Sequence, residues 1–169
     1  LAVLGSDLKV IEDIIKSNSL DCFIANNNSP QQVVISGLKK NVDLFSEVLN
    51  KHKIKNIRLN VSAPFHCKLM KKATENLKDE ILNLNFKEIK KPIISNFTAN
   101  SSTSSLEIKN LLVSQIEGRV KWVESVKFMI DKGTKNFIEI GPGKVLSGLI
   151  KRIDKNISVK SINNEKDIK

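Results

Sequence analysis

The 169-residue sequence is poor in the residue types that mark several protein classes, with two cysteines and two histidines. Two cysteines cannot form the disulfide framework of a small secreted domain, so we expect a reducing, cytoplasmic location. No group of His and Cys has the spacing of a zinc site, so no metal is expected. No apolar run approaches the roughly 18 residues that a membrane-spanning helix needs, so no membrane partner is expected.

Two catalytic motifs are also missing. The G-x-S-x-G turn presents the nucleophilic serine of α/β-hydrolase folds, and the closest stretches here, "ISGL" and "LSGL", lack its first glycine. The stretch "EIGPGKVLSG" (residues 139–148) does not have the spacing of a phosphate-binding loop. We interpret it as a tight turn between a strand and a helix.

Positive charge is in excess, with 28 Lys and Arg against 18 Asp and Glu and a net charge of +10. Such a surface attracts polyanions, including nucleic acid, the phosphates of CoA or an acidic protein. Because the lysines are scattered along the chain, a merely solvated basic surface is the alternative.

The first sixty residues read as strand, helix, strand, strand, helix, strand. Turn residues separate the strands, and apolar residues in the helices recur at helical spacing. This order predicts a ferredoxin-like βαββαβ unit. RNA-recognition modules share the order, but they stack bases on aromatic residues of the third strand. The corresponding stretch, "QQVVISG", has no aromatic residue and the chain has no tyrosine, so nucleic acid is not an expected partner.

Residues 61–169 predict a different arrangement. A helix begins near His66, and a polar loop at residues 100–105 caps another that ends near Gln115. The apolar stretch "NFIEIG" predicts a strand buried in a parallel sheet. Strands and helices alternate, which is typical of an α/β layer, but there are too few strands to close a sheet.

His66 is the candidate catalytic residue, because a neutral imidazole can accept a proton from a hydroxyl or thiol. A surface or capping histidine is the alternative. Cys67 follows His66, but neighbours in a helix point about 100° apart, so the pair is not expected to form a dyad. His52 lies among lysines and is expected to be exposed. Asn26 and Asn28, at the end of a strand, are either turn residues or amide donors at a cleft.

Five segments together resemble one family, the malonyl-CoA:acyl carrier protein transacylases. They are "ANNNSPQQVVISG", "VSAPFHCKLM", "PIISNFTA", "QIEGRVKWVESVKFM" and "FIEIGPGKVLSGLIKRI". The resemblance implies an α/β fold in which a ferredoxin-like subdomain is inserted into a large α/β-hydrolase-like acyltransferase subdomain. Residues 1–60 would be the small subdomain, and residues 61–169 the C-terminal part of the large one.

The same resemblance implies roles for single residues. His66 matches the catalytic base, and Gln115 matches the position whose backbone carbonyl accepts the histidine Nδ1–H. Asn26 and Asn28 match positions near the substrate cleft. Phe65 resembles the pattern of malonyl-selective members.

The implied reaction moves malonyl from CoA to the phosphopantetheine thiol of acyl carrier protein through an acyl-serine, in fatty-acid biosynthesis. Malonyl-CoA and acyl carrier protein are the expected partners, and no cofactor is expected beyond the CoA thioester, which is a substrate. The family's serine and its malonyl-binding arginine lie upstream, and none of Arg58, Arg119 and Arg152 matches that arginine. Because the sequence begins with Leu1, we expect it to be cut from a longer chain. The resemblance implies that it is a C-terminal portion, which needs the missing N-terminal half of the same enzyme and is inactive alone.

Two alternatives remain open from the sequence. The chain could be an acyltransferase lobe of a polyketide synthase, or a non-enzymatic basic βαββαβ binding module.

Overall fold

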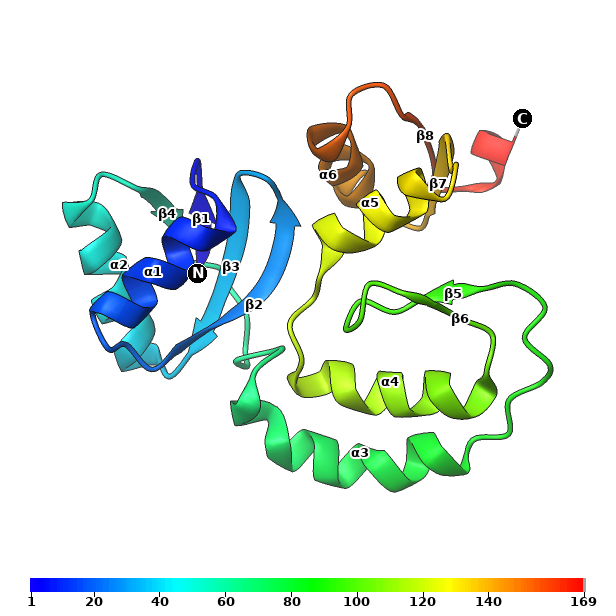
Figure 1. Ribbon diagram of the computed structural model, residues 1–169, viewed down its shortest axis with the longest axis horizontal. Coiled ribbons are helices and arrows are strands. Elements are labelled where there is room, and N and C mark those ends of the chain that lie inside the picture. Colours follow the sequence, from blue (N-terminus) through cyan, green and yellow to red (C-terminus); the bar gives the residue numbers. More distant parts are fainter. Residues whose placement is uncertain (169) are drawn as a thin grey trace. The chain divides into compact units, whose positions relative to one another are not determined.

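The computed structural model describes residues 1–168 (Figure 1). Its internal contacts divide the chain into two compact units, Leu1–Ser125 and a second unit that begins at Val126. This division does not test the subdomain boundary that the sequence predicts near residue 60, which stays a prediction. Among the described helices, none is long and apolar enough to cross a membrane.

The first unit begins with a four-stranded antiparallel sheet in the order β2-β3-β1-β4. The sheet and its two helices follow one another as β1 (Ala2–Leu4), α1 (Leu8–Ser17), β2 (Cys22–Ser29), β3 (Gln32–Gly37), α2 (Lys39–Lys51) and β4 (Lys55–Ile57). This is the βαββαβ order that the sequence predicts. Figure 1 shows these elements in blue to cyan.

Helices α1 and α2 share one hydrophobic core with one face of the sheet. Ile11 of α1 and Phe45 of α2 are fully buried against Val33 and Ile35 of β3. Because side chains alternate along a strand, Val34 and Ser36 of β3 point to the opposite face. The residues of that opposite face are therefore free to line a site.

The edge of the sheet at β2 is joined to a distant segment. Val120 N donates to Ala25 O at 2.8 Å, and Asn27 N donates to Val120 O at 2.9 Å. Asn26 and Val120 form a parallel bridge. Irregular pairing between β2 and β3 begins after Ile24, and such a bulge changes the direction in which the following side chains point.

Two helices and a small hairpin complete the first unit. They follow as η1 (Lys68–Met70), α3 (Lys71–Asn83), β5 (Ile93–Ile94), β6 (Ser101–Ser102) and α4 (Ser105–Glu117). Helices α3 and α4 lie side by side (Figure 1). As expected, the polar loop caps α4, and Ser104 Oγ accepts from Glu107 N at 3.3 Å.

Helix α5 (Trp122–Asp131) spans the division between the units. The second unit then has β7 (Asn136–Ile140), α6 (Val145–Ile153), β8 (Ser158–Ile162) and η2 (Glu165–Ile168). β7 and β8 pair in parallel.

The sequence prediction of a buried parallel sheet was wrong in two respects. β5 and β6 form an antiparallel pair, because a short loop joins them and reverses the chain. β7 is parallel to β8 as expected, but it is not buried, since Ile138 is 60% exposed and Ile140 is 81% exposed. The strands of a wider parallel sheet are buried because helices cover both of its faces, and β7 is not covered on both faces in this way.

Candidate functional site

The candidate base lies on a short loop between the sheet and the α3–α4 pair. His66 precedes η1 rather than standing inside a helix, and its φ of 59° lies in the left-handed region. Few residues other than glycine adopt that region, although histidine does so more often than most. The loop therefore holds His66 in a conformation that its surroundings must maintain.

The ring of His66 is fixed by a backbone acceptor. Its Nδ1 lies 2.9 Å from the carbonyl oxygen of Gln115, near the end of α4. Because a carbonyl only accepts, Nδ1 carries the hydrogen, and Nε2 of the neutral ring is left with its lone pair. This is the contact that the family resemblance implies for Gln115.

A cavity of about 330 Å³ brings together the other residues that the sequence singles out. His66, Phe65, Asn26 and Asn28 all line it, with Ser36 beside them. Asn26 and Asn28 reach the cavity because they alternate with Asn27 along β2 and share the face that carries no helix. The remaining lining residues are mostly apolar: Leu1, Val34, Ile35, Leu59, Val61 and Ala63.

Asn27 points away from this cavity and has a structural role. It is 7% exposed, and its Nδ2 donates to Glu124 Oε2 at 3.1 Å. Glu124 in turn lies 3.8 Å from Arg119, which also pairs with Glu12 at 3.1 Å. This chain of contacts joins α1, β2 and the start of α5.

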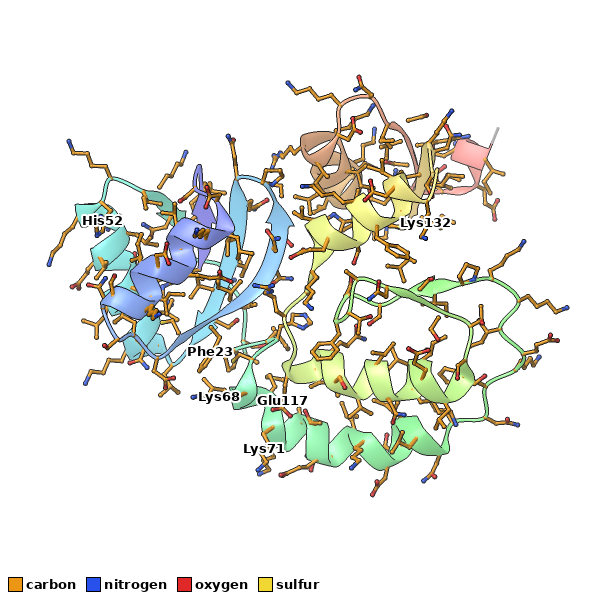
Figure 2. The ribbon with its side chains drawn as sticks, in the orientation of Figure 1. Phe23, His52, Lys68, Lys71, Glu117 and Lys132 are labelled. Carbon is orange, nitrogen blue, oxygen red and sulfur yellow. The ribbon has the colours of Figure 1, made fainter. Side chains whose placement is uncertain are left out.

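A second cavity, of about 440 Å³, also reaches His66 and carries several charges. Lys68 pairs with Asp21 at 3.2 Å and lies 4.7 Å from the centre of the Phe23 ring. Figure 2 shows Lys68 and Glu117 near the loop that carries the base, whereas His52 lies at the far end of α2. Because the charges of Lys68 and Arg119 already have acidic partners, this cavity is a poor candidate for a carboxylate of the substrate.

Neither cysteine is an activated nucleophile. Both line the second cavity, but Cys22 and Cys67 are buried. Burial raises the pKa of Cys22 to about 11 and also raises the pKa of Cys67, whose Sγ donates to Pro64 O at 3.1 Å. A thiol with a raised pKa forms little of the reactive thiolate. In residues 1–168 no cluster of metal-binding side chains is present either.

After the glycine-rich turn at residues 141–143, the first amides of α6 are bonded to a carboxylate of the chain itself. The Glu139 carboxylate accepts from Leu146 N at 3.0 Å and from Ser147 N at 2.8 Å. These amides belong to the first turn of α6, which is where a bound phosphate would be held. The contact supports the interpretation of this segment as a turn rather than a phosphate loop.

Sequence reasoning missed Ser36, a polar neighbour of the loop that carries the base. Ser36 Oγ donates to Phe65 O at 2.7 Å across 29 residues of sequence. The stretch "ISGL" indicates only an incomplete nucleophile turn, and no periodicity or motif signals a hydroxyl that holds a backbone carbonyl.

The comparisons with known proteins show which family the chain belongs to. The family described as "Acyl transferase domain" matches residues 4–165. The malonyl CoA-acyl carrier protein transacylase of Bacillus subtilis is 39% identical over 171 residues, which cover 99% of this chain and 54% of the relative. The protein of the same name from Staphylococcus aureus is 40% identical over 172 residues, with 99% and 56% covered.

Solved structures give the same result. The acyl-carrier-protein-S-malonyltransferase from Bartonella henselae is similar with a TM-score of 0.92 and 36% identity, covering 99% of this chain and 54% of that one. A malonyl-transacylase in complex with its type II PKS acyl-carrier protein has a TM-score of 0.92 and 32% identity, with 98% and 55% covered. The chain thus spans about half the length of the relatives that it matches. It has a mixed α/β fold and belongs to the acyl transferase domain family.

Proposed function

We propose that this chain carries the general base of a transferase that moves malonyl from CoA to the phosphopantetheine thiol of acyl carrier protein. One observation carries the proposal. The ring of His66 is held through Nδ1 on the Gln115 carbonyl, 2.9 Å away, and lines the same cavity as Asn26, Asn28 and Phe65. The names of the relatives from Bacillus subtilis and Staphylococcus aureus supply the substrate class.

In the proposed reaction His66 moves the protons. Its Nε2 accepts the proton of a serine hydroxyl while that oxygen attacks the malonyl thioester, and the CoA thiolate leaves with the proton returned by the imidazolium. The carrier thiol then gives its proton to Nε2 and attacks the acyl-serine, and the serine oxygen recovers a proton as malonyl leaves. The Gln115 carbonyl keeps the ring oriented and stabilises the imidazolium in both steps.

The serine is proposed to come from a segment outside these 169 residues. The sequence contains no G-x-S-x-G turn, and the hydroxyl of Ser36 is already used in a bond to Phe65 O. The malonyl carboxylate also needs a cation other than Arg119, which pairs with Glu12 and Glu124. We therefore expect the isolated chain to be inactive as a transferase.

The cavity beside His66 suits a small acyl group with polar oxygens. The side-chain amides of Asn26 and Asn28 can donate to a carbonyl, and the ring of Phe65 adds bulk next to the base. A bulky ring at this point crowds a methyl branch on the acyl group, which favours malonyl over methylmalonyl.

The proposed architecture follows the family. Residues 1–60 are assigned to the ferredoxin-like small subdomain and residues 61–169 to the C-terminal part of the large acyltransferase subdomain. The antiparallel order β2-β3-β1-β4 supports the first assignment, because it joins the two central strands of a split βαβ unit.

The proposed macromolecular partner is an acyl carrier protein, attracted by the net charge of +10. The relative that was solved with its type II PKS acyl-carrier protein favours a second candidate, a transferase that serves polyketide synthesis. The two candidates share the same chemistry and differ in the carrier protein that they load.

The test uses the complete transferase that contains this chain. Replacing His66 by Ala should slow the transfer of radiolabelled malonyl from CoA to holo-acyl carrier protein by about 10²–10⁴-fold, the usual contribution of a general base. Gln115→Ala keeps the backbone carbonyl and should have a mild effect. His52→Ala, a change at an exposed histidine, is the matched control. Transfer by His66→Ala at the rate of the unaltered enzyme would refute the assignment.

A further inference from the structure

We propose that Ser36 is a positioning residue for His66, acting through the backbone of the loop rather than on the substrate. The hydroxyl of Ser36 donates to the carbonyl oxygen of Phe65 at 2.7 Å. The inference rests on the proposed function only for the role of His66 as the base; the contact between β3 and the loop stands by itself.

The physical reason lies in the peptide group that joins Phe65 to His66. The Phe65 carbonyl and the His66 amide nitrogen belong to one rigid plane. The rotation of that plane about the N–Cα bond of His66 is the angle φ, which is 59° here. A hydrogen bond that fixes the Phe65 oxygen therefore fixes the very angle that is costly for a residue with a side chain.

Ser36 is anchored well enough to serve this purpose. It lies in β3, which is paired with β2 on one side and β1 on the other, and its partner in β2 is Phe23. Its side chain is on the sheet face that carries no helix, beside Phe65 and His66 in the wall of the same cavity. The hydrogen bond thus connects the short loop that carries His66 to a strand of the sheet.

A second contact holds the loop at its other end. Cys67 Sγ donates to Pro64 O at 3.1 Å, which closes the turn on itself. This bond spans only three residues and cannot set the position of the loop relative to the sheet. Lys68, after the loop, also contacts Asp21 and Phe23, but the Ser36 hydroxyl is the contact made to the Phe65–His66 peptide itself. Without it the ring of His66 would keep its bond to Gln115 only part of the time.

The experiment measures which ring nitrogen of His66 carries the hydrogen. In the complete transferase labelled with ¹⁵N-histidine, the signals of His66 and of the exposed His52 are assigned by their loss in His66→Ala and His52→Ala, and His52 serves as an internal reference. In the unaltered chain His66 should be almost entirely the Nδ1–H form, because the Gln115 carbonyl only accepts. Ser36→Ala should convert His66 to a mixture of the two neutral forms, with ¹⁵N shifts that approach those of His52.

Two variants serve as controls. Ser36→Thr keeps a hydroxyl and should keep the Nδ1–H form. Ser46→Ala removes another 2.7 Å side-chain bond in the same α/β layer, from Ser46 Oγ to Asn56 Oδ1, and should leave His66 unchanged.

Three results would overturn the inference. His66 in Ser36→Ala could keep the shifts of the unaltered chain, or Ser46→Ala could mix the two forms to the same degree. Loss of the folded spectrum in Ser36→Ala would show that the hydroxyl supports the sheet as a whole, not the loop. Because no substrate is used, each of these results leaves the transfer assay of His66→Ala to decide the proposed function separately.

Discussion

Gly118 is the position where a single added methyl group should disturb the candidate site most directly. It ends α4, three residues after the carbonyl that holds His66, and its φ of −85° suits any residue. A Cβ built there would lie 2.5 Å from Phe97 Cε2, closer still to Cδ2 of the same ring, and 2.8 Å from Ser114 O. Carbon atoms in contact normally stand about 3.5–4.0 Å apart, so the overlap is about 1 Å or more.

The expected cost of Gly118→Ala follows from this overlap. Because the backbone angles already suit alanine, the whole effect is steric, and overpacking of this kind destabilises by about 1–3 kcal/mol. The Phe97 ring can turn aside, but the Ser114 oxygen belongs to the last turn of α4 and can move only with the helix. The displacement should therefore reach the Gln115 carbonyl in that same turn.

The assay is urea unfolding followed by the fluorescence of Trp122, the single tryptophan, which lies in the first unit. Gly118→Ala should lower the midpoint of the transition. Phe97→Leu makes room for the new methyl group, so the double variant should lose less than the sum of the two single losses. Strict additivity, or an unchanged midpoint for Gly118→Ala, would refute the steric argument.

Two further predictions concern selectivity and pH. Phe65→Ala in the complete transferase should raise kcat/KM for methylmalonyl-CoA relative to malonyl-CoA by about 10-fold, since one methyl group in a pocket has an effect of that order. The ratio is measured with the two substrates in competition. An unchanged ratio would exclude Phe65 as the selective contact. Hydrogen bonds from Ser147, chiefly from its hydroxyl, lower the pKa of Glu139 below its ordinary 4.5. The ionised carboxylate therefore stabilises the fold above pH 4.5, and this contribution is lost as pH falls through the lowered pKa. Glu139→Gln should reduce the urea midpoint, followed by circular dichroism, more at pH 7 than at pH 3, and an equal reduction at both would contradict the role of the charge.

Local pattern was sufficient to predict much of the fold. The apolar stripes of α1 and α2 and the runs of β2 and β3 have clear periods, and each element appears where its period predicts it. The cap of α4 was also readable, because serine before a helix has a specific partner among the first amides. The β5–β6 hairpin was not, since two-residue strands are too short to show any period.

The candidate site was predictable only in part, for a related reason. His66 and the asparagines could be singled out by residue type and by family resemblance. The left-handed backbone at His66 could not be predicted, because no turn motif marks it and its contacts with β3 and α4 come from segments far away in the sequence. Ser36 is separated from Phe65 by 29 residues, so only the folded chain brings the pair together.

The contact between β2 and Val120 has a consequence for behaviour in solution. A strand at the margin of a sheet can recruit another chain through its unpaired amides and carbonyls, which is a common route to aggregation. Here Ala25 O and Asn27 N, on the margin of the four-stranded sheet, are already bonded to Val120. An incoming strand would have to displace the chain's own segment along this stretch, so this part of the β2 edge is closed to strand addition.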